Sequence, residues 1–202
     1  MIHVIAMSIG ASMFGVTIKT ISFGLGRKLM RLGKVQLSMV PLGSFVKLAD
    51  SSDQPLEQVE VGFGQQSLGA RLIIPLLGPI TTITLAYFIL GSPAGNAFVS
   101  TFYQAFNGAV SPLSEAQLYL KQAQLAVDQE PLLIVCGLVL VKVSALNLIP
   151  FPGTTGFQLI LTVITSDQTE SHWQERLANW LLWPLLLFLG SWLVALVFYF
   201  IQ

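Results

Sequence analysis

Two histidines are the side chains of this sequence best suited to acid–base chemistry or metal binding. His3 lies in an apolar stretch at the start of the chain, and His172 lies in a polar segment, residues 167–176. Neutral imidazole is the commonest protein ligand for metals, and histidine titrates near physiological pH. Glu170 is two residues from His172, a spacing that does not share a helix face. We interpret His172 as a solvated surface residue and His3 as a capping residue near the N-terminus.

Serine and lysine offer two further kinds of chemistry. No His–Asp set lies near Ser22, Ser38 or Ser144 in the sequence, so a serine hydrolase is not supported. Lys142 lies within an apolar run, where a charged residue usually has a function or faces a water-filled cavity. It also lies close enough to the end of that run for its side chain to snorkel toward the membrane surface. A functional and a structural role for Lys142 both stay open.

The composition is that of a membrane protein. Of 202 residues, 53% are hydrophobic and only 10% are charged, against about 25% charged residues in an ordinary soluble domain. A soluble protein with an unusually apolar core is the alternative. The formal net charge is zero, so nothing indicates a nucleic-acid partner. The single cysteine, Cys136, lies in an apolar run and is expected to be a small buried hydrophobe.

Three apolar segments approach the length needed to cross a bilayer as helices, which is about 20 residues. They are residues 67–91, residues 131–166, which Pro150 and Pro152 interrupt, and residues 177–201. Residues 1–13 are apolar but cover only about 20 Å as a helix. We therefore expect a truncated first helix, unless the recorded start lies downstream of the true one.

Residues 15–50 differ from the rest, because apolar and polar residues alternate there and glycines interrupt the pattern. This alternation predicts a small β element, which we place at the membrane surface because unpaired strand edges are not tolerated in lipid. Six Lys and Arg residues fall in this segment, whereas residues 92–130 hold Lys121 alone. The positive-inside rule then places the β element in the cytoplasm and residues 92–130 outside, where an amphipathic helix is expected.

Four short motifs resemble those of the site-2 proteases, a family of intramembrane zinc metallopeptidases. Residues 15–26 read GVTIKTISFGLG, similar to the family's G-V-x-V-x-x-F-S-I-G-F-G, and residues 40–48 read VPLGSFVKL, similar to I-P-L-G-G-Y-V-K-M. Arg71 with the later sequence LGPI resembles the start of the family's next transmembrane helix, and residues 147–152, NLIPFP, resemble N-x-x-P-x-P. Their order and coverage of most of the chain make the resemblance specific.

The resemblance implies a zinc site whose positions are mostly replaced. The family's H-E-x-x-H, with two zinc-binding histidines one turn apart and a glutamate base, falls on His3-Val4-Ile5-Ala6-Met7. The family's zinc-binding aspartate falls on Thr155, and the glycine after it is kept as Gly156. Valine cannot accept a proton, and a thioether and a hydroxyl are poor zinc ligands beside imidazole and carboxylate.

The resemblance also implies a groove that holds an extended substrate or partner, and we assign to it Asn147, Pro150, Pro152 and Gly156. The hypothesis is a catalytically inactive pseudoprotease that acts as a membrane scaffold or binding subunit. Its partners would be membrane lipid and another membrane protein or transmembrane helix. The alternative is an active zinc metalloprotease with divergent ligands that cleaves transmembrane substrates. We expect no cofactor, with zinc on His3 as the remaining alternative.

The fold expected from these observations is a mainly α, polytopic membrane protein. It is a minimal site-2 protease core of about four helices with a small membrane-associated β element, in one domain, residues 1–202. Its parts in order are residues 1–13, 15–50, 67–91, 92–130, 131–166 and 177–201. We expect an integral protein of the bacterial inner membrane or of an organelle membrane.

Overall fold

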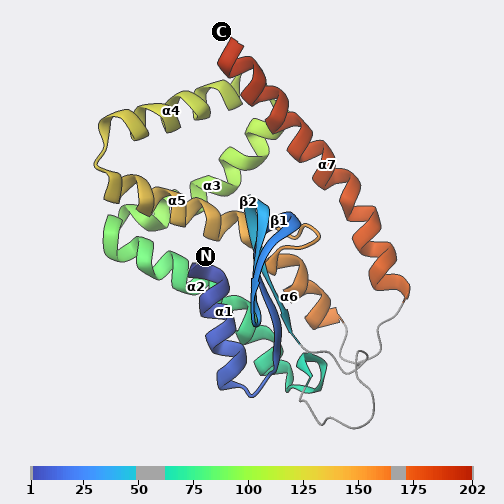
Figure 1. The fold of residues 1–202 in the computed structure, drawn as a ribbon. Helices are drawn as coiled ribbons and strands as arrows, with labels where there is room; N and C mark the ends of the chain where they lie inside the picture. Colours follow the sequence, from blue (N-terminus) through green and yellow to red (C-terminus); the bar gives the residue numbers. More distant parts are fainter. Residues whose placement is uncertain (1, 49–61, 165–171, 202) are drawn as a thin grey trace. The chain divides into compact units, whose positions relative to one another are not determined.

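The structure, a computed structural model, describes residues 2–48, 62–164 and 172–201 and is mainly helical (Figure 1). Its elements group into two compact units, one of Met1–Thr81 with Leu161–Thr169 and one of Thr82–Ile160 with Glu170–Gln202. In chain order the elements are α1 (Ile2–Met13), β1 (Ile18–Leu32), β2 (Val35–Leu48), the short 3-10 helix η2 (Phe63–Gln65), α2 (Leu68–Leu90), α3 (Pro93–Val110), α4 (Glu115–Gln129), α5 (Leu132–Asn147), α6 (Thr155–Ile164) and α7 (His172–Ile201).

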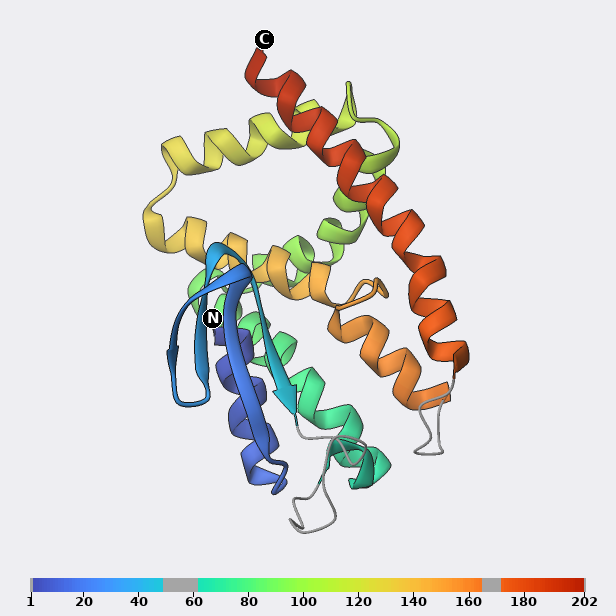
Figure 2. The ribbon, with the colours of Figure 1, turned by 45° about the vertical axis from the view of Figure 1, so that its right-hand side comes forward.

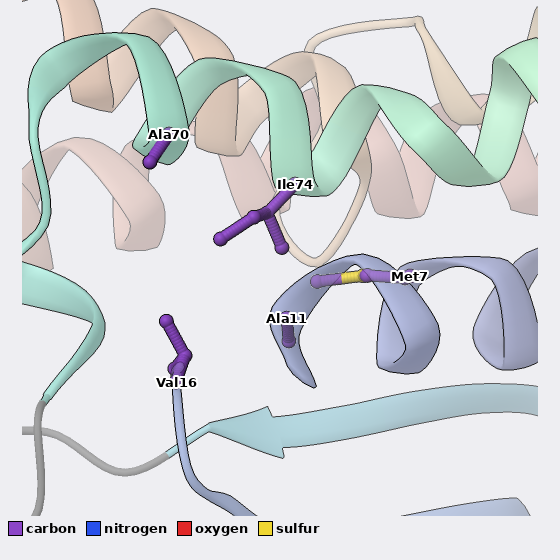
Figure 3. Close-up of a cluster of buried hydrophobic side chains, with 5 residues drawn as sticks. All are labelled: Met7, Ala11, Val16, Ala70 and Ile74. Atoms are coloured by element: carbon purple, nitrogen blue, oxygen red, sulfur yellow. The ribbon is translucent and has the colours of Figure 1, made fainter. Parts of the chain in front are cut away.

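The core of the first unit is a cluster of buried apolar side chains between α1 and the start of α2. The cluster consists of Met7, Ala11, Val16, Ala70 and Ile74. In Figure 3 the Ile74 side chain extends from α2 toward Met7 and Ala11 on α1. Ala11 and Ala70 are small, so the larger side chains of Met7 and Ile74 fill the space between the two helices. This packing fixes which face of α1 is turned inward.

The β element is present as predicted, and its two long strands pair with each other twice. Ile21 is aligned with Val46 in one part of β2 and with Val35 in another, so the start of β1 lies between two parts of β2. Register shifts accompany the bends that this double pairing requires. Gly33, at a φ of 59°, forms the turn between the strands, a conformation that glycine adopts without steric cost. The position of the sheet at a membrane surface stays a prediction.

The second unit is built on contacts of α7 with α3 and α4. Trp192 of α7 lies against Gly108 of α3, where an added Cβ would come 2.3 Å from the indole, and its Nε1 donates to the carbonyl oxygen of Ala105 at 3.0 Å. Gln117 of α4 donates through Nε2 to the carbonyl oxygen of Ala195 at 2.9 Å. In Figure 2, as in Figure 1, α4 lies beside the C-terminal part of α7. The lack of a side chain at Gly108 is what allows the tryptophan to lie so close.

Among the residues that the structure describes, two helices are long and apolar enough to cross a membrane, α2 over Leu68–Leu90 and α7 over Arg176–Ile201. Both were predicted as spans. A break separates α5 from α6, within the segment predicted as a broken helix, but at 16 and 10 residues each of these helices is shorter than the about 20 residues that cross a bilayer. Polytopic insertion and a single membrane domain therefore stay predictions.

Three expectations need correction. Residues 92–130 form two helices, α3 and α4, rather than a loop with one amphipathic helix, so the described residues hold seven α-helices instead of about four. Residues 111–114, which include Pro112, connect α3 to α4. Cys136 is exposed on α5 rather than buried. An apolar run on an exposed helix face cannot be told from a buried run by sequence alone, which explains this error.

Candidate functional site

The residues at the family's H-E-x-x-H positions lie on the first two turns of α1. His3 and Met7 are one turn apart and so share a helix face. Val4 is 1% exposed and Met7 is 8% exposed, whereas the His3 side chain is only partly buried. The spacing of the predicted metal-binding motif is thus present on the helix, while two of the three residues that the resemblance assigns to it, Val4 and Met7, have apolar or nearly apolar side chains.

The His3 imidazole faces the backbone of α2. A Cβ built on Gly78 would come 2.3 Å from His3 Nδ1 and 2.4 Å from Cε1, so the ring occupies the space that a side chain at this position would need. His3 Nδ1 is buried and has no hydrogen-bond partner among the described residues. An unpaired buried nitrogen is unfavourable unless something else occupies its lone pair or proton. It is the single feature of this site that still suits a ligand.

The second set of predicted residues surrounds the break between α5 and α6. The Thr154 hydroxyl lies 2.6 Å from the carbonyl oxygen of Ile149 and accepts a hydrogen bond from the backbone N–H of Phe157 at 3.3 Å. It therefore caps the start of α6 and ties this start to the end of α5. Gly153 has a φ of 89°, which a residue with a side chain adopts only with strain. These features hold the break in one shape.

Gly156 is packed directly against the backbone of this break. A Cβ at this position would come 2.2 Å from the carbonyl oxygen of Leu148. Thr155, at the position of the family's aspartate, is 4% exposed. The glycine is therefore required by close approach of two backbone segments, whatever the residue before it contributes.

The other residues predicted for the groove have different environments. The Asn147 side chain donates through Nδ2 to the carbonyl oxygen of Val143 at 3.0 Å, within its own helix. Pro150 is exposed and Pro152 is partly exposed. Pro150 has no backbone N–H for a helical hydrogen bond, which explains why α5 ends where it does. The use of these residues to hold a substrate or partner stays a prediction.

The donor atoms of these positions do not fit a zinc ion. Structural and catalytic zinc sites use at least three Cys, His, Asp or Glu ligands, and the described residues contain no group of three such side chains placed to hold a metal. His3 supplies one nitrogen, while Val4 supplies none and Met7 and Thr155 offer a thioether and a hydroxyl. No step of a reaction can be derived from this set through a metal.

Sequence reasoning weighed Lys142 but missed the environment that contains it. Its Nζ donates to Oε1 of Gln104 at 2.6 Å, and both residues line a cavity of about 350 Å³ in the second unit. Tyr119 also lines this cavity, and a hydrogen bond with Glu115 raises the pKa of its hydroxyl above the ordinary value. Gln104 lies on α3, which was expected to be a loop, so no sequence signal pointed to the pair.

Two other residues that the sequence analysis weighed cannot be placed. Residues 165–171, with Glu170, lie outside the described part, as does the side chain of His172.

Comparisons with known proteins give the family. The model of "Peptidase family M50" matches residues 1–189. The chain is also 36% identical over 93 residues to a protein of Vibrio cholerae serotype O1 named "Putative zinc metalloprotease", with 40% of this chain and 21% of that protein covered. The chain thus spans about a fifth of the length of this relative. Four motifs in order, a helix break held by Gly156 and the family match agree, and the chain is a membrane protein that belongs to peptidase family M50, the site-2 proteases.

Proposed function

We propose that this chain is a catalytically inactive member of its family that binds a transmembrane segment of another membrane protein without cleaving it. The observation that carries the proposal is the burial of Met7. This residue stands where the family has its second zinc-binding histidine, and its side chain is part of the apolar cluster with Ala11 and Ile74. A position that helps to hold α1 against α2 is committed to packing, so it is poorly suited to hold a metal ligand.

The features that would bind a partner are better preserved than those that would cut it. The break between α5 and α6 contains the glycine and the prolines of the family's motif, and the β element consists of two long paired strands. Strand addition to a sheet edge is a common way to hold an extended peptide, because its backbone hydrogen bonds do not depend on catalysis. We place the β element on the cytoplasmic side, from its six basic residues.

The alternative is an active protease with divergent ligands. It is favoured by His3 Nδ1, a buried nitrogen without a described hydrogen-bond partner. A metal on this atom would need further ligands from side chains that the described residues do not supply. The two proposals differ in the metal content that they require and in the fate of the bound segment.

The zinc content of the purified protein distinguishes the inactive protein from the active protease. We expect less than about 0.1 zinc per chain after purification without chelator or added metal, because a site with one strong ligand exchanges its metal during purification. Elemental analysis of the protein by mass spectrometry measures this ratio, and a His3→Ala variant is the matched control. Stoichiometric zinc that His3→Ala abolishes would overturn the proposal and support the active protease.

The fate of a bound segment tests the binding role directly. A photocrosslinking amino acid placed at Pro150, an exposed residue in the helix break, is expected to capture a membrane protein at its full length. The same amino acid at Leu113, which is 59% exposed between α3 and α4, is the control position. The adducts are sized in native membranes with and without a zinc chelator. Captured fragments that become full-length proteins when the chelator is added would show cleavage and contradict the proposal.

A further inference from the structure

The cavity of about 350 Å³ lies between four helices of the second unit, namely α3, α4, α5 and α7. None of the family's catalytic positions lines it, so it is separate from the site described above. Most of its lining is apolar, with contributions from Ala105, Leu120, Leu146, Phe188 and Leu189. Its volume falls within the range of about 300–1,000 Å³ that is usual for small-molecule sites.

One positive charge faces this apolar space. The Nζ of Lys142 donates to Gln104 Oε1 at 2.6 Å, and this partner is a neutral amide. An ammonium group has three protons to donate, so this hydrogen bond satisfies one of them. The described residues that line the cavity include no aspartate or glutamate. A charge placed beside apolar surface is costly unless an opposite charge accompanies it.

The other polar side chains of the lining already have hydrogen-bond partners, since the Tyr119 hydroxyl bonds with Glu115 and Trp192 Nε1 donates to the carbonyl oxygen of Ala105. The Thr101 hydroxyl, on the same helix as Gln104, donates to the carbonyl oxygen of Ala97 at 2.6 Å and is therefore used within α3. Gln104 has an amide NH₂ group as well as the oxygen that accepts from Lys142. The donors for an anion are thus gathered at Lys142 and Gln104, while Leu146 and Phe188 supply apolar surface for the remainder of a ligand.

We propose that this cavity binds a single-chain amphiphile with a carboxylate, such as a fatty-acid anion. The carboxylate accepts hydrogen bonds from Lys142 Nζ and the Gln104 amide, and the acyl chain lies along Leu146, Leu189 and Phe188. One lysine balances one negative charge, which fits a monoanion. A surrounding bilayer would supply such an amphiphile. The helix α7 has exposed apolar side chains that a bilayer would cover, such as Trp183 (72% exposed) and Leu187 (74% exposed).

Direct binding of palmitate tests this proposal. The purified full chain in a neutral detergent is titrated with radiolabelled palmitate, and we expect one saturable site per chain. Lys142→Met should weaken binding at least about tenfold, because it removes a charge-assisted hydrogen bond and the countercharge. Lys121→Met is the matched control, since Lys121 is exposed on α4 and is not part of the cavity lining. It should bind palmitate like the unchanged protein.

A competing ligand without the charge and a variant that fills the cavity provide two further tests of palmitate binding. Hexadecanol, which has the chain without the charge, should compete at least about tenfold less well than palmitate. Ala123→Phe fills the cavity from an exposed position on α4, so it should abolish binding even if Lys142→Met does not fold. Equal palmitate binding by folded Lys142→Met, or by Ala123→Phe, would overturn the proposal. So would displacement of palmitate by much lower concentrations of phosphatidylglycerol, which would assign the cavity to a phospholipid instead.

Discussion

Met7→His is expected to lower the free energy of unfolding by about 3 kcal/mol, even though it restores a residue of the family's zinc motif. Met7 is 8% exposed and packs in the cluster with Ala11, Val16, Ala70 and Ile74. Replacement removes well-packed apolar atoms and places polar imidazole nitrogens among them, and each effect costs about 1–3 kcal/mol. Denaturant or thermal unfolding in detergent, followed by circular dichroism, measures the loss.

Met13→His is the matched control for this change. Met13 ends the same helix and is 81% exposed, so the identical replacement should alter stability by no more than about 0.5 kcal/mol. The full reconstruction, Val4→Glu with Met7→His and Thr155→Asp, introduces polar groups at three buried positions. We expect it to bind zinc weakly and to leave a model transmembrane substrate uncleaved, because ligands need precise placement and supporting hydrogen bonds.

This reconstruction can contradict the proposed function. If the triple variant keeps its stability, takes up one zinc per chain and cleaves the substrate, the Met7 position must accept a ligand without loss of packing. The burial of Met7 would then no longer argue for an inactive protein. The Met7→His variant alone distinguishes a packing defect from a failure of the metal site, because its stability is measured without zinc.

Gly156→Ala is also expected to lower the free energy of unfolding by about 3 kcal/mol, because of a backbone clash rather than a loss of apolar packing. The added Cβ would meet the carbonyl oxygen of Leu148 at 2.2 Å and its carbonyl carbon at 2.6 Å. These are backbone atoms at the helix break, so relief requires movement of the chain rather than rotation of a side chain, and overpacking of this kind costs about 1–3 kcal/mol or more. The break itself should change shape, since Thr154 ties it to the start of α6.

Gly190→Ala is the control for Gly156→Ala. Gly190 lies within α7 and nothing lies within 4 Å of an added Cβ there. Because alanine has the higher helix propensity, we expect this control to be neutral or to stabilise the protein by up to about 1 kcal/mol. Unfolding in detergent measures both variants, and limited proteolysis across residues 148–154 reports on the break. A Gly156→Ala variant as stable as Gly190→Ala would show that the glycine is not needed for close approach.

The sequence alone predicted the elements whose signals are local. Alternation and glycines predicted the β element now seen as β1 and β2, and apolar runs predicted α2 and α7. Pro150 and Pro152 predicted the break between α5 and α6, because proline cannot continue the hydrogen-bond pattern of a helix. Residues 92–130 were misread since they lack a long apolar run. Pro93, at the first position of α3, is a local start signal that could have corrected the reading.

The motifs of the sequence also predicted the family, which the family match over residues 1–189 confirms, because the order of motifs needs no coordinates. Only the tertiary structure decided which face of α1 packs inward, and hence that Met7 is part of the core while Met13 is exposed. It likewise placed Gly78 against His3, and Lys142 beside Gln104 in a shared cavity. These pairs are far apart in the chain, and no local pattern encodes them. They arise when helices pack, since close packing is a property of the whole set of neighbours.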